Sequence, residues 1–300
     1  MGRPNAGKST LLNAMIGDKV AIVSDKPQTT RNRIVGILTE SRGQAVFFDL
    51  PGVHKPLHRM NTRMMKEVRS ALEEVDVVLH LLDASAQWGG GEVFLFELLR
   101  DVRPDVVGVL TKIDLVRAKA DLLPLIDSYG ERRPGSTVVP VSSVEDDGLD
   151  VLLDELFDRL PVGPPLFAAD LTTTQTERFF VAEVIREKLL ERTRDELPYT
   201  TGVVVDLFDD GGRVLHLEAV IYVERKSQKG IVIGRGGSLI RAVGQAAREE
   251  LERVLGTPIY LGLRVKVHPR WRDDPQVLIA MDAGAADLRT IHGSDSPSEE

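Results

Sequence analysis

The feature that most constrains the fold is a phosphate-binding loop that begins at the second residue. Gly2, Gly7, Lys8 and Ser9 match the pattern G-x-x-x-x-G-K-[ST]. In this pattern backbone N–H groups curl around a diphosphate, and the helix that follows points its positive end at the same group. The stretch TLLNAMIG comes next, with apolar residues at helical spacing, and it favours this loop over an unrelated glycine-rich turn.

Only Met1 precedes this loop in the sequence, although such a loop normally follows a buried strand. In a doubly wound sheet that strand is central and covered on both faces. Without it, the neighbouring strands would lack ladder partners. We therefore expect the functional protein to begin several residues upstream, with a strand rich in valine or isoleucine.

Composition predicts an ordinary globular protein of two domains. The 300 residues are 42% hydrophobic and 28% charged, and the absence of cysteine excludes disulfides and thiolate metal sites. No apolar run approaches the roughly 20 residues that span a bilayer, and no secretion signal is present, so we expect a cytoplasmic protein. The net charge of −8 is uneven, because residues 273–300 hold seven acidic residues and one basic residue.

Apolar runs alternate with helical patterns through the first half of the chain. An apolar run ends at Asp49, and the valine-rich runs in VDVVLHLLDAS, DVVGVLTKID and STVVPVSS follow, the last two ending at Thr111 and Ser142. Helical patterns cover 92–100 and 118–128. The runs suit strands that are buried on both faces, and the alternation predicts a doubly wound α/β sheet. Such sheets bind ligands at the carboxyl ends of their strands, where these three polar residues are expected.

The segment DLPG at 49–52 is suited to a metal and a terminal phosphate. Asp49 at the strand end can hold Mg²⁺ through a water, and the backbone N–H of Gly52 can reach the phosphate. Lys8 is expected on the outer phosphates and the Ser9 hydroxyl on Mg²⁺. An aspartate before Pro-Gly is often a plain turn, but its place in an ordered series of motifs favours the nucleotide site.

The segment TKID at 111–114 predicts a preference for guanine. Asp114 can accept hydrogen bonds from the ring N–H and the exocyclic amine of guanine, a donor pair that adenine lacks. Lys112 is expected to pack its stem along the base, and a backbone N–H at Ser142 or Ser143 to meet the guanine carbonyl. The motifs together predict a domain that binds GTP or GDP with Mg²⁺.

In order and in flanking residues, GRPNAGKST, DKPQTTRNRI, DLPGVHKP, TKID and VSS resemble the nucleotide motifs of the Era family of GTPases. The resemblance implies that QTTR is the first switch, so Thr29 or Thr30 closes on Mg²⁺ and the γ-phosphate. We favour Thr30, although the sequence leaves both open. Thr111 departs from the family's asparagine, which predicts weaker guanine affinity, and Ser143 departs from its small residue.

The predicted nucleotide site combines phosphate, metal and base contacts. Lys8 and Thr30 are expected to position the reacting groups without a side-chain base, and the metal ligands are Ser9, Thr30 and, through water, Asp49. Val53 stands where many GTPases carry a water-orienting glutamine, so we expect slow intrinsic turnover. The full set is Gly2, Arg3, Pro4, Asn5, Ala6, Gly7, Lys8, Ser9, Thr10, Asp49, Leu50, Pro51, Gly52, Val53, Thr111, Lys112, Ile113, Asp114, Ser142 and Ser143.

The second half predicts a smaller α+β domain that follows a proline-rich linker. Its patterns run in the order αββααβ, and the residues GRGG at 234–237 lie between two adjacent helices. A G-x-x-G loop there lets a nucleic-acid backbone approach the helix N-termini, as in KH domains that bind single strands of about four nucleotides.

Basic residues gather around this loop in an otherwise acidic protein. The stretch 225–241 holds five basic residues and no acidic one, and 260–272 also lacks acidic residues. A local basic patch of this kind favours RNA as the partner. We expect the RNA contacts to come from Lys229, Gly234, Arg235, Gly236, Gly237 and Arg241.

The second half is also similar to the KH half of Era proteins in ELPYTTGVVVDLF, ERKSQKGIVIGRGGSLIRAVGQAAR and LRVKVHPRWR. The resemblance implies a GTP-hydrolysing switch that binds the 3′ end of 16S ribosomal RNA in assembly of the 30S subunit. It also implies a monomer with peripheral contact at the inner face of the plasma membrane. Two alternatives stay open: an RNA-binding KH protein whose nucleotide domain is structural or inactive, and a GTPase that acts on another RNA.

These patterns predict four segments along the chain. We expect a GTPase domain over 1–160, a linker over 161–170, a type II KH domain over 171–275, and a mostly disordered acidic tail over 276–300.

Overall fold

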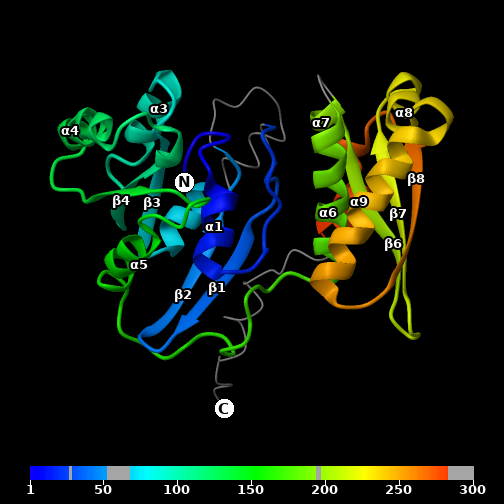
Figure 1. Cartoon of the computed structure of the whole chain (residues 1–300), viewed down its shortest axis with the longest axis horizontal. Helices are drawn as coiled ribbons and strands as arrows, with labels where there is room; N and C mark the ends of the chain where they lie inside the picture. The colour runs from blue at the N-terminus through cyan, green and yellow to red at the C-terminus, as the bar shows by residue number, and fades with distance from the viewer. Residues whose placement is uncertain (27–28, 53–67, 194–196, 283–300) are drawn as a thin grey trace, which may run out of the picture. The chain divides into compact units, whose positions relative to one another are not determined.

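The structure is a computed structural model that describes residues 1–26, 29–52, 68–193 and 197–282 (Figure 1). It divides into two compact units. The first comprises Met1–Thr173 with Arg186–Thr200, and the second comprises Thr174–Ile185 with the chain from Thr201 onward. The chain first passes from the first unit to the second after Thr173.

Two sheets form the framework of the first unit. β3 (Val77–Asp83), β4 (Asp105–Thr111) and β5 (Val138–Val141) are parallel and adjacent in that order. β1 (Ile34–Glu40) and β2 (Gly43–Asp49) form an antiparallel hairpin. Because parallel strands end at one edge of a sheet, the Thr111 and Ser142 motifs after β4 and β5 meet there, as the sequence predicted. Asp49 instead ends β2 in the hairpin sheet.

Along the chain, a helix at 90–98 lies between β3 and β4 and another at 123–132 lies between β4 and β5, which confirms the predicted α/β alternation. The region predicted as one helix over 118–128 is instead a 3₁₀ turn, η2 (Lys119–Leu122), followed by a longer α-helix, because Pro124 suits the first turn of a helix better than its interior. Four helices have defined bounds, namely α1 (Lys8–Ile16), α3 (Gly90–Leu98), α4 (Leu123–Arg132) and α5 (Leu149–Phe157). Residues 68–74 are also helical, and η1 (Ile113–Leu115) is a further 3₁₀ turn.

The two residues ahead of the phosphate loop lie along β3. The Leu81 N–H donates to the Met1 carbonyl at 2.7 Å, and Gly2 forms a parallel bridge with Leu81. A Cβ on Gly2 would lie 2.8 Å from the Leu81 carbonyl oxygen, so this approach requires glycine. Backbone contacts therefore hold the start of the phosphate loop against β3. Within the described residues, the β1-β2 and β3-β4-β5 sheets stay separate.

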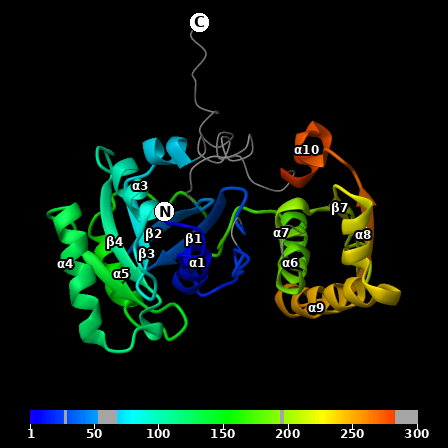
Figure 2. The same cartoon turned by 90° about the horizontal axis from the view of Figure 1, so that it is seen from above.

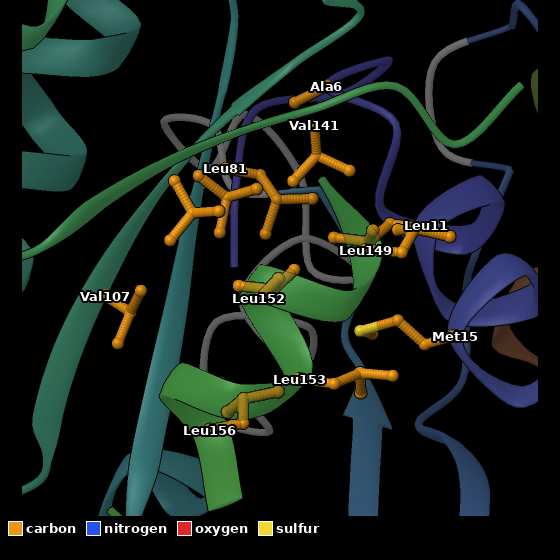
Figure 3. Packing of buried hydrophobic residues seen from close by; sticks show 12 residues of the cluster. Ala6, Leu11, Met15, Leu81, Val107, Val141, Leu149, Leu152, Leu153 and Leu156 are labelled. Atoms are coloured by element: carbon orange, nitrogen blue, oxygen red, sulfur yellow. The ribbon is translucent and has the colours of Figure 1, made fainter. Parts of the chain in front are cut away.

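A continuous apolar cluster packs α1 and α5 against the three-stranded sheet (Figure 3). Burial of one such aliphatic side chain contributes roughly 1.5–3 kcal/mol. Since α1 begins directly after the phosphate loop, this cluster also fixes the loop's position. Its buried members are Ala6, Leu11, Met15, Leu81, Val107, Val109, Val139, Val141, Leu149, Leu152, Leu153 and Leu156.

His80 of β3 is completely buried beside aromatic side chains. Its Nδ1 lies 3.3 Å from the Tyr129 hydroxyl, and its ring meets Phe96 edge-on. Burial, with smaller contributions from the terminal amine and Arg133, lowers the pKa of His80 to about 3. His80 is therefore neutral in the folded protein at any pH above that value.

Acidification should destabilise the first unit through His80. An unfolded histidine binds a proton near pH 6.5, whereas the folded one does not, so stability falls as pH drops below 6.5. Between pH 7 and pH 5 this group should cost about 2 kcal/mol of unfolding free energy. Urea unfolding of the wild type and of His80→Gln at both pH values measures the effect. An equal loss of stability in the two proteins would show that another group is responsible.

The second unit has the predicted αββααβ order. β6 and β7 pair antiparallel, β7 and β8 pair parallel, and α8 and α9 pack on β8 and on each other (Figure 1). Figure 2 shows α8 next to α9 from above. The last part of α6 and the whole of α7 are grouped with the first unit. The elements are α6 (Glu177–Arg192), α7 (Leu197–Thr200), β6 (Gly202–Asp209), β7 (Leu215–Val223), α8 (Lys226–Ile233), α9 (Ser238–Leu255) and β8 (Ile259–Val267).

The described part of the chain ends in a short helix. A 3₁₀ turn, η4 (Trp271–Asp273), leads into α10 (Pro275–Asp282), and Trp271 and Val277 pack with Val204 of β6. The tail predicted from residue 276 therefore begins as a helix, and residues 283–300 lie outside the described residues. Among the described helices, none is long and apolar enough to cross a membrane.

Candidate functional site

The phosphate loop takes its shape from residues in the left-handed conformation. Asn5 has φ 65° and Gly7 has φ 79°, and α1 starts at Lys8. Lys8 Nζ donates to the Arg3 carbonyl at 2.9 Å, which places the ammonium across the loop. Loss of water around the ammonium lowers the pKa of Lys8, although the Asp49 carboxylate partly opposes this shift. Phosphate oxygens would supply the counter-charge that this cation lacks.

The predicted metal ligands converge on one carboxylate. Ser9 Oγ donates to Asp49 Oδ2 at 2.5 Å, Thr30 Oγ1 donates to the same oxygen at 3.1 Å, and the two hydroxyls are 3.1 Å apart. Asp49 Oδ1 is buried and has no hydrogen-bond partner among the described residues. Oxygen donors of this kind are the ligands that Mg²⁺ prefers, so the residues present fit the ion.

The structure separates the two threonines between which the sequence could not choose. Thr29 Oγ1 donates to the Lys26 carbonyl at 2.6 Å, away from Asp49. Thr30 is only 5% exposed and meets Asp49. The arrangement therefore favours Thr30 as the metal ligand of the first switch.

The DLPG segment lies against the phosphate loop. A Cβ on Gly52 would come within 2.9 Å of Pro4, so the two loops touch only because this residue is glycine. Leu50 and Ala6 are buried in apolar clusters, so their side chains pack in the core and only their backbone can face a nucleotide. Val53, on which the expectation of slow hydrolysis depends, lies outside the described residues.

The base-recognition carboxylate is held by a buried serine. Ser142 Oγ donates to Asp114 Oδ1 at 2.7 Å and accepts from the Glu145 N–H at 3.1 Å. The Ser142 backbone N–H donates to the Asp147 carbonyl, which leaves Ser143 as the candidate for the guanine carbonyl contact. The side-chain role of Ser142 was not predicted, because it depends on two strand ends being adjacent.

Thr111 links the TKID segment to the phosphate loop. Its hydroxyl lies 3.0 Å from the Ala6 carbonyl and 3.2 Å from the Leu82 carbonyl. A hydroxyl has one proton, so it donates to one of these carbonyls at a time. Thr111 thus keeps a tie to the phosphate loop, although it cannot donate to both carbonyls at once as an amide can.

Two acidic residues outside the predicted set hold residues within it. Glu92 of α3 accepts from Arg3 Nη1 at 2.8 Å, and Asp83 accepts from Lys112 Nζ at 2.6 Å. Arg3 is therefore directed at α3 rather than into the loop. Asp83 carries the same sequence signal as Asp49, namely a carboxylate at the end of an apolar strand, and this signal could have found it.

In the second unit, the glycine-rich loop joins the end of α8 to the start of α9 and leaves the start of α9 open. Gly234, Gly236 and Gly237 all have positive φ, and no atom lies within 4 Å of the position of a Cβ on Gly236. No side chain caps the start of α9. Around this loop Arg235 and Arg241 are exposed, and neither forms an ion pair with another described residue. The loop therefore offers backbone N–H groups and positive charge to a ligand.

Comparison with known proteins identifies both units. Residues 1–112 match the model of the 50S ribosome-binding GTPase family, and residues 196–272 match that of the KH domain. GTPase Era of Heliobacterium modesticaldum is 49% identical over 281 residues, which cover 93% of each chain. The chain belongs to the Era family of GTPases. GTPase Era of Lacticaseibacillus paracasei is 44% identical over 96% of each chain.

Solved Era structures share the whole architecture. Era of Aquifex aeolicus bound to GDP and AlF4⁻ has a TM-score of 0.89 at 35% identity and covers 94% of this chain and 97% of its own. An Era in complex with MgGDPNP and nucleotides 1506–1542 of 16S ribosomal RNA has a TM-score of 0.90 at 35% identity, over 94% and 96%. The predicted family, fold and guanine-nucleotide and Mg²⁺ cofactors are confirmed, and the protein is a GTPase.

Proposed function

We propose that this protein is a GTP-controlled switch that binds the 3′ end of 16S ribosomal RNA and acts in assembly of the small ribosomal subunit. The observation that carries the proposal is the GRGG loop, which precedes the uncapped start of α9 and has exposed arginines beside it. It is supported by 35% identity to an Era whose structure contains nucleotides 1506–1542 of that RNA.

In the proposed nucleotide site, each group of residues has one task. The loop N–H groups and Lys8 hold the phosphates, Ser9 and Thr30 bind Mg²⁺ directly, and Asp49 binds it through water. Bound Mg²⁺ neutralises charge on the β- and γ-phosphates. No described side chain is assigned as a base, so backbone or a partner must position the attacking water, and we expect slow intrinsic turnover.

The same site gives the switch its nucleotide dependence. The γ-phosphate of GTP would favour the arrangement in which Thr30 lies on the metal, and its loss on hydrolysis would free the segment that carries Thr30. Because GTP and GDP then favour different arrangements of this segment, RNA affinity should differ between the two states. For the RNA contacts we propose Lys229, Gly234, Arg235, Gly236, Gly237 and Arg241.

Arg235→Asp should weaken RNA binding by at least about 10-fold at moderate salt, because it places a negative charge beside the RNA phosphates. Fluorescence anisotropy with a labelled oligonucleotide of the 16S 3′ end measures the affinity, once with a nonhydrolysable GTP analogue and once with GDP. The variant should keep its GTP affinity, since the nucleotide site is unchanged.

Arg253→Asp is the matched control, because it makes the same charge change on α9 at a side chain that is 73% exposed. If both variants lose RNA affinity equally, the effect comes from the overall charge of the unit and not from a contact at the loop. Equal RNA affinity of the wild type with the GTP analogue and with GDP would remove the switch from the proposal.

The proposal also includes the setting in which the protein works. The family resemblance supports a cytoplasmic monomer that makes peripheral contact with the inner face of the plasma membrane. The small ribosomal subunit is the proposed assembly partner.

A further inference from the structure

The end of β3 lies beside the base-recognition loop. In the parallel register of β3 and β4, Asp83 pairs with Thr111, which opens TKID. The Ala84 N–H donates to the Thr111 carbonyl at 2.9 Å, so backbone bonding continues past the last strand residue. Asp83 and Lys112 are therefore close because two parallel strands end together, although 29 positions separate them.

The two oxygens of the Asp83 carboxylate have different partners. Oδ1 accepts from the Ser85 N–H at 2.9 Å and from Ser85 Oγ at 2.6 Å, which orients the carboxylate. Oδ2 is left for Lys112 Nζ at 2.6 Å. Partial burial raises the pKa of Asp83, but hydrogen bonds from Lys112 and Ser85 outweigh it and hold the pKa below its usual value. Asp83 is thus an oriented, charged acceptor.

Lys112 begins from an uncommon backbone conformation. Its φ of 59° is left-handed, which a residue with a long side chain rarely adopts. The free side chain of a lysine has many rotamers, and a stem that packs along a base must give up most of them. An anchored ammonium removes that freedom before the nucleotide binds, so less entropy is lost on binding.

We propose that Asp83 is a positioning residue for guanine: it anchors the Lys112 ammonium, so that the Lys112 stem forms a fixed surface for the base. Lys112 and Asp83 side chains are 33% and 20% exposed, and ion pairs with this much water access add little to stability. A role in binding therefore accounts for the pair better than a role in folding. The inference rests on the proposed assignment of Lys112 and Asp114 to the base.

Asp83→Asn tests the anchor. The asparagine keeps an acceptor for Ser85 and the same shape, but it loses the charge that holds Lys112. Affinity for mant-GDP and for a mant-labelled nonhydrolysable GTP analogue should fall by a similar factor of about 5, because base contacts are common to both nucleotides. The melting temperature of the nucleotide-free protein should not change. Asp154→Asn, which removes an ion pair with Arg42 elsewhere in the first unit, should leave both affinities unchanged.

A double-mutant cycle with Lys112→Met separates positioning from a structural role. Methionine retains an apolar stem without the ammonium, so Asp83→Asn should have no further effect in the Lys112→Met background. A full effect in that background, or unchanged affinity in Asp83→Asn alone, overturns the inference. If Lys112→Met itself leaves guanine affinity unchanged, the base assignment in the proposed function fails instead. Asp83→Glu should recover part of the lost affinity.

Discussion

Lys8→Ala should reduce kcat/KM for GTP hydrolysis at least about 100-fold. Lys8 Nζ lies across the phosphate loop on the Arg3 carbonyl, and its pKa is lowered because the ammonium has lost water without gaining a full counter-charge. The outer phosphates supply that charge, and the cation stabilises the negative charge that develops on them as the transition state forms. Phosphate release under multiple turnover measures the loss.

In Lys8→Ala the loss of affinity should be larger for a nucleotide with three phosphates than for one with two. Because Lys8 is placed on the outer phosphates, Lys8→Ala should weaken binding of a GTP analogue more than binding of GDP. Lys119→Ala is the matched control, since Lys119 is 82% exposed and pairs with Asp147 on the surface. Hydrolysis within a few-fold of the wild type in Lys8→Ala would mean that the loop at residues 2–9 does not hold the reacting phosphates.

Asp114→Asn should exchange a preference for guanine for a preference for xanthine. In the proposed site the two carboxylate oxygens of Asp114 would accept from the ring N–H and the exocyclic amine of guanine, whereas an asparagine amide offers one acceptor and one donor. Xanthine carries a carbonyl in place of the amine and fits that pair. GDP affinity should fall by at least about 100-fold, because the unmatched amine and amide donors would be buried together.

Competition of GDP and of xanthosine diphosphate against mant-GDP measures the exchange. Ser142 Oγ donates to Asp114 Oδ1. In Asp114→Asn the Ser142 hydroxyl still needs an acceptor, so the amide oxygen of the asparagine should face Ser142. Asp127→Asn on the surface of α4 is the matched control and should leave the preference unchanged. A variant that still prefers GDP would show that another group reads the base.

Much of the nucleotide site could be predicted because its motifs are contiguous. The phosphate loop and α1 depend on neighbouring residues, namely left-handed Asn5 and Gly7 before a helical pattern. The same holds for the GRGG loop, where glycines with positive φ lie between two helices. Such backbone conformations depend on residues that are consecutive in the sequence. The contiguous motifs were therefore enough to identify the family and both domains.

The ligand-orienting contacts could not be predicted in the same way. Thr29 and Thr30 are chemically identical neighbours, and only the approach of Asp49 distinguishes them. Thr111 differs from the family's asparagine, and its tie to the Ala6 carbonyl becomes visible only where β4 ends beside the phosphate loop. Asp83 and Ser142 reach Lys112 and Asp114 across neighbouring strand ends.

The sequence by itself determined the order of the motifs and the two domain types, because local backbone conformation and side-chain chemistry depend on consecutive residues. It also predicts which residues contact the ligands. Only the tertiary structure decided which hydroxyl meets Asp49, what holds Asp114, and that Asp83 anchors Lys112. Each of these contacts joins residues between 19 and 29 positions apart. Such contacts form when apolar packing brings the strand ends to one edge, where hydrogen bonds then select single partners.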